Sequence, residues 1–297
     1  MTTLVFTMSG AQSLAEEMAD DLGLQLGHIK VHEFPDGETL FRIMDPVAGK
    51  HVCLVARLDK PDDKTLQILI LADGLRQQDA ASVTLVAPYL PYMRQDIAFN
   101  SGEVVSARAF AKLISQSFDR VVTVDPHLHR YAALDEVYTI PAQTVSAAAP
   151  MAHWIGQQTS APLIIGPDIE SEQWVSKVSS ALDAPFYTLR KVRKGDHDVE
   201  ISLSELNVDT DGTLVLVDDI ISSGATMLRT IEQLHVAFPD REIICCAVHC
   251  LASAETLDQF SAMGVRAMAA TDSVQSKIST IKISGMLSAA LAKELEA

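Results

Sequence analysis

Short runs of β-branched and other apolar residues recur along the chain and alternate with segments of helical periodicity. The apolar runs predict strands at residues 3–6, 51–56, 82–87, 120–124, 163–165, 185–189, 213–217 and 242–248. Apolar residues repeating every three or four positions predict helices at residues 11–22, 64–77, 104–117, 171–180, 225–236 and 253–263. Because strands alternate with helices, we expect an α/β fold whose parallel sheets are covered by helices on both faces.

Most of the predicted strands are followed directly by glycine, proline or an acidic residue. Examples are Asp125-Pro126, Gly166-Pro167-Asp168 and Asp218-Asp219. In open parallel sheets, ligands bind beyond the carboxyl ends of the strands. The candidate chemistry of this chain is therefore expected in these loops.

The length and one short segment suggest how the chain is divided. At roughly 150 residues per domain, 297 residues correspond to two domains or to one large α/β domain. Residues 140–150 are rich in small side chains and bracketed by prolines, which predicts a seam near the middle of the chain. We therefore expect an N-terminal domain over residues 1–143 and a C-terminal domain over residues 144–297. Each half carries three or four predicted strands, which permits an internal duplication that the sequence does not otherwise reveal.

Composition and charge narrow the partners that the protein can have. Apolar residues make up 48% of the chain and charged residues 21%, which is typical of globular proteins. The 39 acidic and 23 basic residues give a formal net charge of −16. A surface this acidic repels nucleic-acid backbones and anionic lipid, so we expect no nucleic-acid partner and no membrane partner. An anionic substrate would need a pocket that is locally basic or assisted by a metal.

The sequence also predicts a cytoplasmic location. It has no run of about 20 uncharged apolar residues, and its start lacks the basic segment of a signal peptide. Cys245, Cys246 and Cys250 lie close to His249, which could be read as a metal site. All four residues, however, lie in the apolar run 243–251, which favours a buried strand in which cysteine acts as a small apolar residue.

The segment from residue 213 to residue 226 carries the most informative chemistry. A buried apolar strand is predicted to end in Asp218 and Asp219, and the helix that begins near residue 225 follows a turn of small residues. Free N–H groups and the helix dipole favour a phosphate at such a turn. The residues that would contact this phosphate are Ser222, Ser223, Gly224, Ala225 and Thr226. The two carboxylates suit sugar hydroxyls or Mg²⁺ at the other end of the ligand.

An alternative for this segment is an ordinary strand, turn and helix with a capping serine and solvated acids. Each piece taken alone favours that alternative. Two adjacent carboxylates at a strand end, however, repel one another unless a cation or a diol compensates them. The combination therefore favours a loop that binds a sugar phosphate.

Residues 217–226 resemble the phosphoribosyl-pyrophosphate loop of the phosphoribosyltransferase fold. Four further segments, in order along the chain, are similar to those of the ribose-phosphate pyrophosphokinase family: residues 34–38, 91–96, 124–127 and 166–168. The resemblance implies two similar phosphoribosyltransferase-type domains, each a mainly parallel sheet flanked by helices, with the last helix packing back on the N-terminal domain. It also implies an enzyme that transfers the diphosphoryl group of MgATP to the C1 hydroxyl of ribose 5-phosphate, giving 5-phosphoribosyl 1-diphosphate and AMP.

The resemblance assigns a role to each of these segments. The loop from Ser222 to Thr226 would hold the 5-phosphate, and Asp218 and Asp219 would bind the ribose hydroxyls. The Mg²⁺ ligands that it implies are His127, Asp168, Asp218 and Asp219. The ATP-binding residues that it implies are Phe34, Asp36, Glu38, Arg94, Gln95, Asp96 and His127. The catalytic residues that it implies are Lys191, Arg193 and His127. Because relatives supply the residue 34–38 loop from a neighbouring subunit, a homo-oligomer is expected, either a dimer or a tetramer.

Most of these residues also have an ordinary structural interpretation when taken alone. Asp168 could cap the turn after Gly166-Pro167, and Arg94 could be solvated. Residues 35–37 fit the turn of a hairpin, and residues 191–198 fit a solvated hairpin. His127 could be a loop imidazole, and His129, for which we find no counterpart in the family, is interpreted as structural.

Three features depart from the family pattern. Residues 169–171 (Ile-Glu-Ser) replace a glycine-rich turn, so the backbone donors of that loop are in question. Residues 97–103 lack the basic character of many relatives, so regulation by phosphate or ADP is not expected. The chain is also shorter than the phosphate-activated class and more similar to archaeal-type relatives. Two other functions are a phosphoribosyltransferase, whose single domain would leave the first 145 residues unexplained, and a regulatory protein without catalytic activity.

Overall fold

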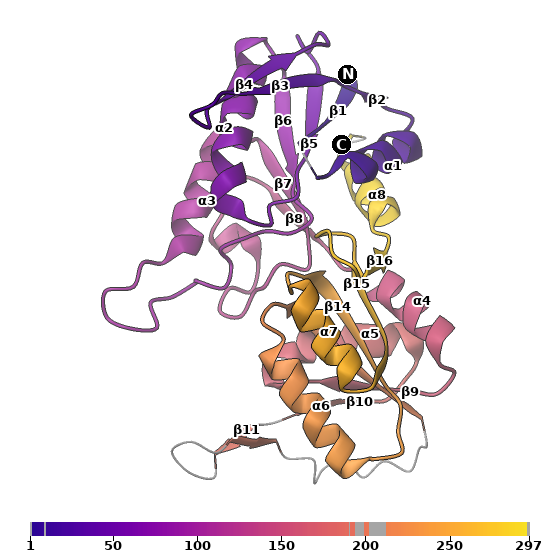
Figure 1. The fold of residues 1–297 in the computed structure, drawn as a ribbon. Helices are drawn as coiled ribbons and strands as arrows, with labels where there is room; N and C mark the ends of the chain where they lie inside the picture. The colour runs from indigo at the N-terminus through magenta and orange to yellow at the C-terminus, as the bar shows by residue number, and fades with distance from the viewer. Residues whose placement is uncertain (1, 9, 190, 194–198, 202–211, 296–297) are drawn as a thin grey trace. The chain divides into compact units, whose positions relative to one another are not determined.

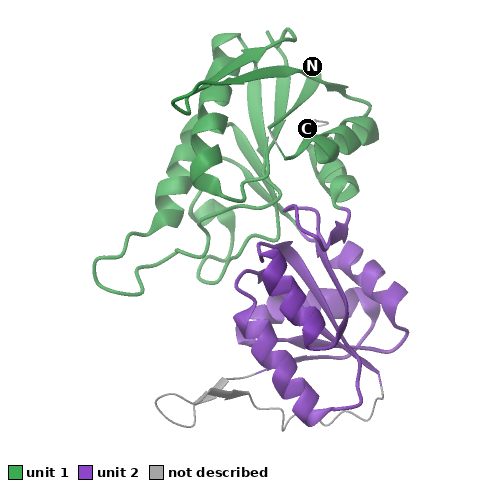
Figure 2. Cartoon of the chain, in the orientation of Figure 1, with its two compact units in different colours: residues 1–145, 283–297 green, residues 146–282 purple. Residues whose placement is uncertain are grey.

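The computed structural model describes residues 2–8, 10–189, 191–193, 199–201 and 212–295. Helices and strands alternate along these residues, as the sequence predicted, and every strand pair within the two large sheets is parallel (Figure 1). The chain forms two compact units (Figure 2). Unit 1 comprises residues 1–145 and 283–297, and unit 2 comprises residues 146–282.

Unit 1 is a six-stranded parallel sheet with helices on both faces. Its strands, in spatial order, are β2 (Gln25–Leu26), β1 (Thr3–Thr7), β5 (His51–Val55), β6 (Ser82–Val86), β7 (Arg120–Val124) and β8 (Ala142–Val145). Its helices are α1 (Gln12–Leu22), α2 (Pro61–Gln77), α3 (Ser106–Ser117), the 3₁₀ turn η1 (Leu134–Glu136) and α8 (Ser284–Leu295). Helices α2 and α3 cover one face of the sheet, whereas α1 and α8 pack together on the other (Figure 1).

Unit 2 has the same construction. Its strands, in spatial order, are β10 (Phe186–Thr188), β9 (Pro162–Gly166), β13 (Thr213–Ile221), β14 (Ile243–Cys250), β15 (Val265–Thr271) and β16 (Ser279–Ile281). Its helices are α4 (Ala148–Gln158), the 3₁₀ turn η2 (Ile169–Ser171), α5 (Glu172–Leu182), α6 (Ala225–Ala237) and α7 (Ala254–Ala262).

The two units are related by an internal duplication. Numbered along the chain within each unit, their strands stand in the same spatial order. An antiparallel hairpin is inserted after the edge strand of each sheet. The hairpin of unit 1 is β3 (Ile29–Glu33) with β4 (Thr39–Ile43), and that of unit 2 is β11 (Lys191–Arg193) with β12 (Val199–Ile201). The duplication that the sequence only permitted is therefore visible in the topology.

The units exchange the helix that follows the last strand of each sheet. Helix α4 follows β8 of the first sheet but belongs to unit 2, where it packs against α5. Helix α8 follows β16 of the second sheet but belongs to unit 1, where it packs against α1. Each unit thus contains one helix that follows, along the chain, the last strand of the other unit's sheet.

Strand β14 shows why the cluster of cysteines is structural. All eight of its residues are buried, in agreement with the apolar run from which a strand was predicted. Burial raises the pKa of the Cys245 and Cys246 thiols, and it raises that of Cys53 on β5 to about 12. These thiols therefore stay protonated and pack as small apolar groups.

Residues 140–150, where the seam was predicted, contain β8 and the beginning of α4, and the two units divide after Val145. One local prediction was wrong, namely that the strand before the two aspartates covers only residues 213–217. Strand β13 does not end before the two aspartates but continues to Ile221. Pairing with β14 extends this far, with Ile220 opposite His249, so the carboxylates lie within the strand.

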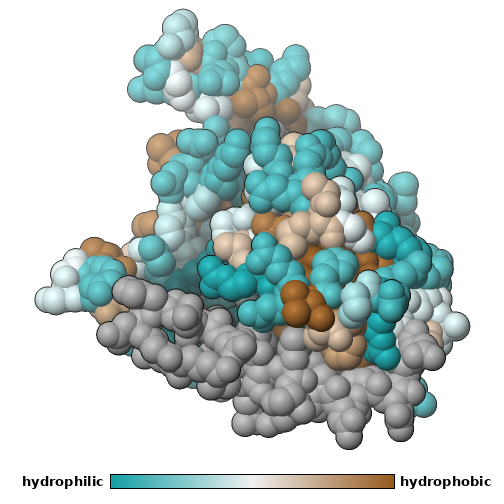
Figure 3. All heavy atoms as spheres, turned by 60° about the horizontal axis from the view of Figure 1, so that its bottom comes forward, coloured by the Kyte–Doolittle hydropathy of each residue, from teal (hydrophilic) through white to brown (hydrophobic). Residues whose placement is uncertain are grey.

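The surface agrees with the acidic composition. The face drawn in Figure 3 is mostly hydrophilic, with apolar side chains scattered over it. Among the described residues, no helix is both long enough and apolar enough to span a bilayer.

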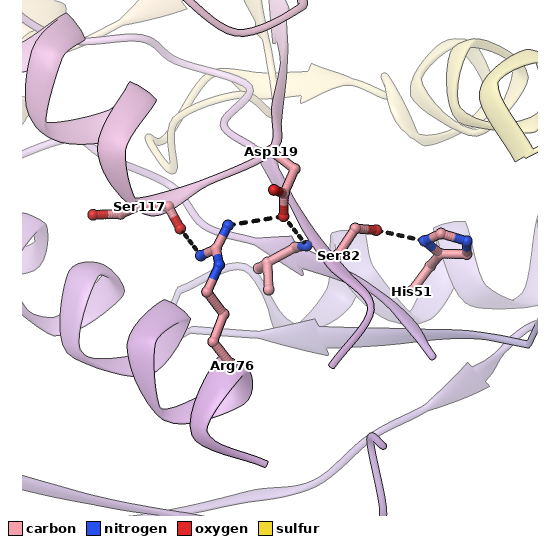
Figure 4. A network of polar contacts seen from close by, with 6 residues as sticks. His51, Arg76, Ser82, Ser117 and Asp119 are labelled. Atoms are coloured by element: carbon pink, nitrogen blue, oxygen red, sulfur yellow. Dashed lines mark hydrogen bonds and ion pairs between the residues drawn. The ribbon is translucent and has the colours of Figure 1, made fainter. Parts of the chain in front are cut away.

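A polar network joins the elements of unit 1 at the amino ends of its strands (Figure 4). The Arg76 guanidinium, in the last turn of α2, donates to the Ser117 carbonyl and pairs with Asp119 at 2.8 Å. His51 and Ser82, at the starts of neighbouring strands, are joined by a second hydrogen bond. These contacts hold α2 against the end of α3, opposite the carboxyl ends at which ligands are expected.

Candidate active site

The carboxyl end of the unit 2 sheet carries two adjacent acids on β13. Asp219 is buried and Asp218 is half-buried, and the Asp219 N–H donates to Asp218 Oδ1 at 3.0 Å. Burial raises the pKa of Asp218 well above its usual 3.8, and the negative charges of Asp219 and Asp168 raise it further. The site therefore concentrates negative charge that a bound cation or hydrogen-bond donor would relieve.

Asp168 joins this pair from the loop after β9, the strand beside β13. Its carboxylate accepts a hydrogen bond from the Glu170 N–H at 3.1 Å, and its carbonyl accepts from Ser171 Oγ at 2.6 Å. The glycine-free residues 169–171 thus form a 3₁₀ turn capped by Asp168 itself. A Cβ on Gly166 would lie 2.2 Å from Ser171 Oγ, so this turn also requires the glycine that ends β9.

The loop after β13 leads directly into helix α6. Gly224 precedes the helix with φ +74°, and a Cβ there would lie 2.8 Å from Thr256 Cγ2 and 2.9 Å from Phe260. Ser223 Oγ accepts from the Ala225 N–H at 3.4 Å, but no described side chain caps α6 from the residue before it. Ser223 and Thr226 are exposed, so the amino end of α6 presents hydroxyls and N–H groups to a ligand.

These three segments suit a sugar phosphate bound together with a hard cation. The loop offers donors for a phosphate, and the three aspartates offer acceptors for hydroxyls and oxygen ligands for a metal. Within the described part of the chain, no three His, Cys, Asp or Glu side chains gather as a ready-made metal site.

In unit 1, the segment after β6 brings a basic side chain to the surface. Arg94 and Gln95 are exposed, whereas Asp96 is buried and pairs with Arg130 Nη1 at 2.8 Å. The Tyr131 hydroxyl donates to the Asp96 carbonyl at 3.3 Å. Asp96 therefore fixes this segment to residues 130–131, and sequence reasoning missed Arg130 because it stands apart from every motif.

His127 follows β7, the next strand of the same sheet. Its ring lies edge-on to that of His129, with the ring centroids 4.0 Å apart and the planes at 82°. Asp125, two residues earlier, is buried and has φ +30°, which is uncommon for a non-glycine residue and especially so before a proline. The sequence carried no signal for this conformation.

The hairpin of β3 and β4 carries the aromatic candidate at its turn. The Phe34 N–H donates to the Glu38 carbonyl at 2.8 Å, and Asp36 Oδ1 accepts from the Glu38 N–H at 3.1 Å. The Phe34 ring is 38% exposed and lies edge-on to His32. The turn predicted at residues 35–37 is therefore present, and it leaves the ring available for stacking.

The two cationic candidates lie on β11. Lys191 pairs with Ile201 and Arg193 with Val199 in an antiparallel hairpin, as the charged segment predicted. Lys191 and Arg193 are two residues apart on this strand. Their side chains and residues 194–198 lie outside the described residues, so their catalytic role stays a prediction.

Comparisons with known proteins cover nearly the whole chain. Residues 3–117 match the family model described as the N-terminal domain of ribose phosphate pyrophosphokinase, and residues 134–274 match the phosphoribosyl transferase domain. A ribose-phosphate pyrophosphokinase of Halobacterium salinarum is 31% identical over 97% of this chain and 100% of its own length. That of Methanothermobacter thermautotrophicus is 32% identical over 96% and 98%.

A solved structure has the same fold over its full length. The phosphoribosylpyrophosphate synthetase of Mycobacterium smegmatis matches 100% of this chain and 99% of its own, with a TM-score of 0.85 and 21% identity. The similarity of the chain to archaeal relatives, expected from the sequence, is confirmed by the two archaeal proteins. Because these likenesses include the first 145 residues, a single-domain transferase does not account for the chain.

Proposed function

The chain belongs to the ribose-phosphate pyrophosphokinase family, and from this premise we propose how its two units share the reaction. The protein transfers the diphosphoryl group of ATP to the C1 hydroxyl of ribose 5-phosphate, giving 5-phosphoribosyl 1-diphosphate and AMP. The single observation that carries the proposal is the joint presence, in unit 2, of the adjacent acids Asp218 and Asp219 and of the glycine-preceded amino end of α6.

We assign ribose 5-phosphate to unit 2. Its phosphate would bind the N–H and hydroxyl groups of residues 222–226, and its hydroxyls would donate to Asp218 and Asp219. The raised pKa of Asp218 supports this assignment, because a carboxylate held among like charges gains most from a ligand that donates to it.

We assign Mg²⁺ to the same edge of the sheet. Asp168, Asp218 and Asp219 would hold it in unit 2, whereas His127, the further ligand that the family resemblance implies, belongs to unit 1. The donor set fits a hard divalent cation, because carboxylate oxygens are its preferred ligands and the charges of Asp219 and Asp168 both raise the pKa of Asp218. When bound, the ion would neutralise charge on the diphosphoryl group during transfer.

ATP is assigned to unit 1. Arg94 would bind its phosphates, and Gln95 would read a polar edge of the nucleotide. Phe34 would stack on the adenine, with Asp36 and Glu38 accepting from its exocyclic amine. Asp96 would act through Arg130, holding this segment in place.

Lys191 and Arg193 would act on the diphosphoryl group itself. Attack falls on the β-phosphorus, so the enzyme must hold two anions in line and stabilise the charge that develops between them. Two cationic residues so close together in the sequence are suited to that task. They also explain how a protein of net charge −16 could bind anionic substrates, because Lys191 and Arg193 would supply positive charge next to the diphosphoryl group.

The assembly that we propose is a homo-oligomer, a dimer or a tetramer, in the cytoplasm. The outer side of the hairpin in unit 1 supports it, because Leu40 and Met44, on the face opposite to Phe41 and Ile43, are both 47% exposed. Apolar side chains gathered on one hairpin favour a protein partner. A second copy there would also bring Phe34 to a neighbouring active site.

The test is to incubate the purified chain with ribose 5-phosphate, ATP and Mg²⁺ and to follow products by phosphorus NMR and mass spectrometry. Equal amounts of AMP and 5-phosphoribosyl 1-diphosphate are expected. ADP would contradict diphosphoryl transfer. Tight nucleotide binding without any product would instead favour the regulatory protein.

A further inference from the structure

The register of the strands allows the two units to be compared residue by residue. Thr3 pairs with His51 in unit 1, and Pro162 pairs with Thr213 in unit 2, each at the first residue of equivalent strands. Counted from these pairs, equivalent positions carry core side chains in both units: Leu4 and Leu163, Phe6 and Ile165, and Leu54 and Leu216. The comparison therefore preserves which face of the sheet each residue occupies.

The same count places Arg57 of unit 1 where unit 2 has Asp219. Arg57 lies six residues after His51, and Asp219 lies six residues after Thr213. The two residues are 2% and 3% exposed, so a buried charge has been kept while its sign has been reversed. Both stand at the point where the strand order changes direction, which is where doubly wound sheets bind their ligands.

The Arg57 side chain bridges this crevice in unit 1. Its Nη1 donates to the carbonyl of Gly10, in the loop that follows β1. The equivalent loop of unit 2 carries Asp168, whose negative charge acts on Asp218. Where unit 2 leaves acids facing one another, unit 1 joins the same two loops with a guanidinium.

The loop from β5 to α2 is fixed at a second point. Lys64, in the first turns of α2, donates to the Arg57 carbonyl at 2.9 Å and pairs with Asp59 at 2.8 Å. The equivalent loop of unit 2, residues 222–226, has mostly small and exposed side chains. The loop that can receive a phosphate in unit 2 is therefore tied to its own helix in unit 1.

Helix α2 also contacts the segment that carries Arg94. Asp62, also in its first turn, accepts a hydrogen bond from the Tyr92 hydroxyl. Tyr92 has φ +65°, and its carbonyl accepts from the Gln95 N–H at 3.0 Å. Its ring lies 5.1 Å from that of Phe110, centroid to centroid.

We propose that the unit 1 counterpart of the sugar-phosphate loop has become a support for the nucleotide-binding segment, with Arg57 and Tyr92 as positioning residues. Arg57 closes the crevice, so each chain binds one ribose 5-phosphate although its fold is duplicated. Tyr92 connects the closed loop to Arg94 and Gln95. The inference rests on the proposed function in one respect, namely that unit 1 binds ATP.

The experiment measures two affinities for each variant by calorimetry. The probes are the α,β-methylene analogue of ATP with Mg²⁺, which resists attack at the β-phosphorus, and ribose 5-phosphate. Tyr92→Phe removes one hydroxyl and keeps the ring, and Arg57→Met removes the bridge and keeps much of the bulk. Each substitution is expected to lower the affinity for the ATP analogue about tenfold, as when a hydrogen bond to a charged group is lost. Ribose 5-phosphate should keep its affinity and its ratio of one per chain.

Two further variants serve as controls. Tyr138→Phe removes the hydroxyl of another buried tyrosine of unit 1, one for which the described residues provide no hydrogen-bond partner. It should leave both affinities unchanged. Arg57→Lys keeps a donor and should recover part of the ATP affinity lost in Arg57→Met. Thermal unfolding of each variant separates a loss of fold from a loss of positioning.

Three results would overturn the inference. One is a Tyr92→Phe variant that binds the ATP analogue as the unmodified chain does. Another is an Arg57→Met variant whose affinities for the ATP analogue and for ribose 5-phosphate fall equally. The last is the binding of two ribose 5-phosphate molecules to each unmodified chain. If the unmodified chain makes AMP and 5-phosphoribosyl 1-diphosphate, these results contradict only this inference. If it does not bind the ATP analogue at all, the proposed function fails and this inference fails with it.

Discussion

The raised pKa of Asp218 makes a prediction about stability at the scale of one residue. A carboxyl whose pKa is raised on folding stabilises the protein below its ordinary pKa of 3.8 and loses that contribution as pH rises through the folded value. Asp218→Asn removes a charge that is unfavourable at neutral pH. The variant without ligand should therefore unfold at a higher temperature than the original chain at pH 7, with the difference shrinking toward pH 3.

The control for this prediction is Asp20→Asn, at an exposed position on α1. It should leave the unfolding temperature nearly unchanged at both pH values. Mg²⁺ should stabilise the original chain more than Asp218→Asn, because only a bound ligand stabilises by mass action. A variant that is less stable at pH 7 would contradict the electrostatic account of the site.

Lys191 is expected to act mainly in the transition state. Lys191→Ala should lower kcat by about two to three orders of magnitude while leaving the affinity for ribose 5-phosphate nearly intact. Steady-state kinetics and calorimetry measure the two quantities separately. Lys112→Ala, at an exposed position on α3, is the matched control. Equal losses in turnover and binding would argue against this role.

Asp219 is expected to act in binding rather than in turnover. Asp219→Ala removes a buried carboxylate that we propose accepts hydrogen bonds from the ribose hydroxyls, so it should weaken the binding of ribose 5-phosphate by about tenfold or more. Calorimetry with the ATP analogue should show an unchanged affinity for the nucleotide. A variant that loses the nucleotide instead would reverse the assignment of the two substrates.

At the scale of the element, the loop between β13 and α6 depends on one glycine. Gly224→Ala would place a Cβ at φ +74° and within 3 Å of Thr256 and Phe260. The backbone conformation costs about 1–2 kcal/mol and the overpacking about 1–3 kcal/mol more. Chemical denaturation should show a loss of about 3 kcal/mol, together with weaker binding of ribose 5-phosphate.

Gly285→Ala is the contrasting substitution within a helix. A Cβ at Gly285 meets no atom within 4 Å, so alanine should stabilise α8 by up to about 1 kcal/mol through its helix propensity. Should Gly224→Ala prove as harmless as Gly285→Ala, the loop would not be held in the conformation described here.

At the scale of the whole molecule, helix α8 comes from the end of the chain and packs against α1 to complete the core of unit 1. Leu287 and Leu291 are buried, and Glu294 pairs with Arg120 at 2.8 Å. Leu291→Ala should cost about 2–5 kcal/mol, whereas Glu294→Gln should cost about 1 kcal/mol or less, because that ion pair is partly exposed.

Hydrogen exchange tests where this destabilisation is felt. Leu291→Ala should reduce amide protection on α1 and α8, which pack together, and leave α4 and α5 of unit 2 unchanged. A uniform loss of protection in both units would mean that the chain unfolds as a single block.

The sequence determined the longer elements and supplied the candidate segments for the site. Short apolar runs are typical of strands buried on both faces, so β1, β5, β6, β7, β9 and β14 could be predicted from the pattern of apolar residues along the chain. The acids, hydroxyls and glycine at residues 218–226 predicted a sugar-phosphate loop because all of these groups are neighbours in the sequence. Short or mixed segments such as β2 and β8 carried too little pattern to be separated from loops.

Only the tertiary structure decided the relations between distant residues. The extension of β13 past Asp219 depends on pairing with β14, and the pairs Asp96–Arg130 and Arg57–Gly10 join residues far apart in the chain. The sequence only permitted the duplication, and the return of α8 to unit 1 was expected from the family resemblance alone, since strand order and packing partner are set by how buried faces meet. A local pattern indicates the secondary structure of one segment and which of its sides is buried. Which segments pack together in one core depends on the folded chain as a whole.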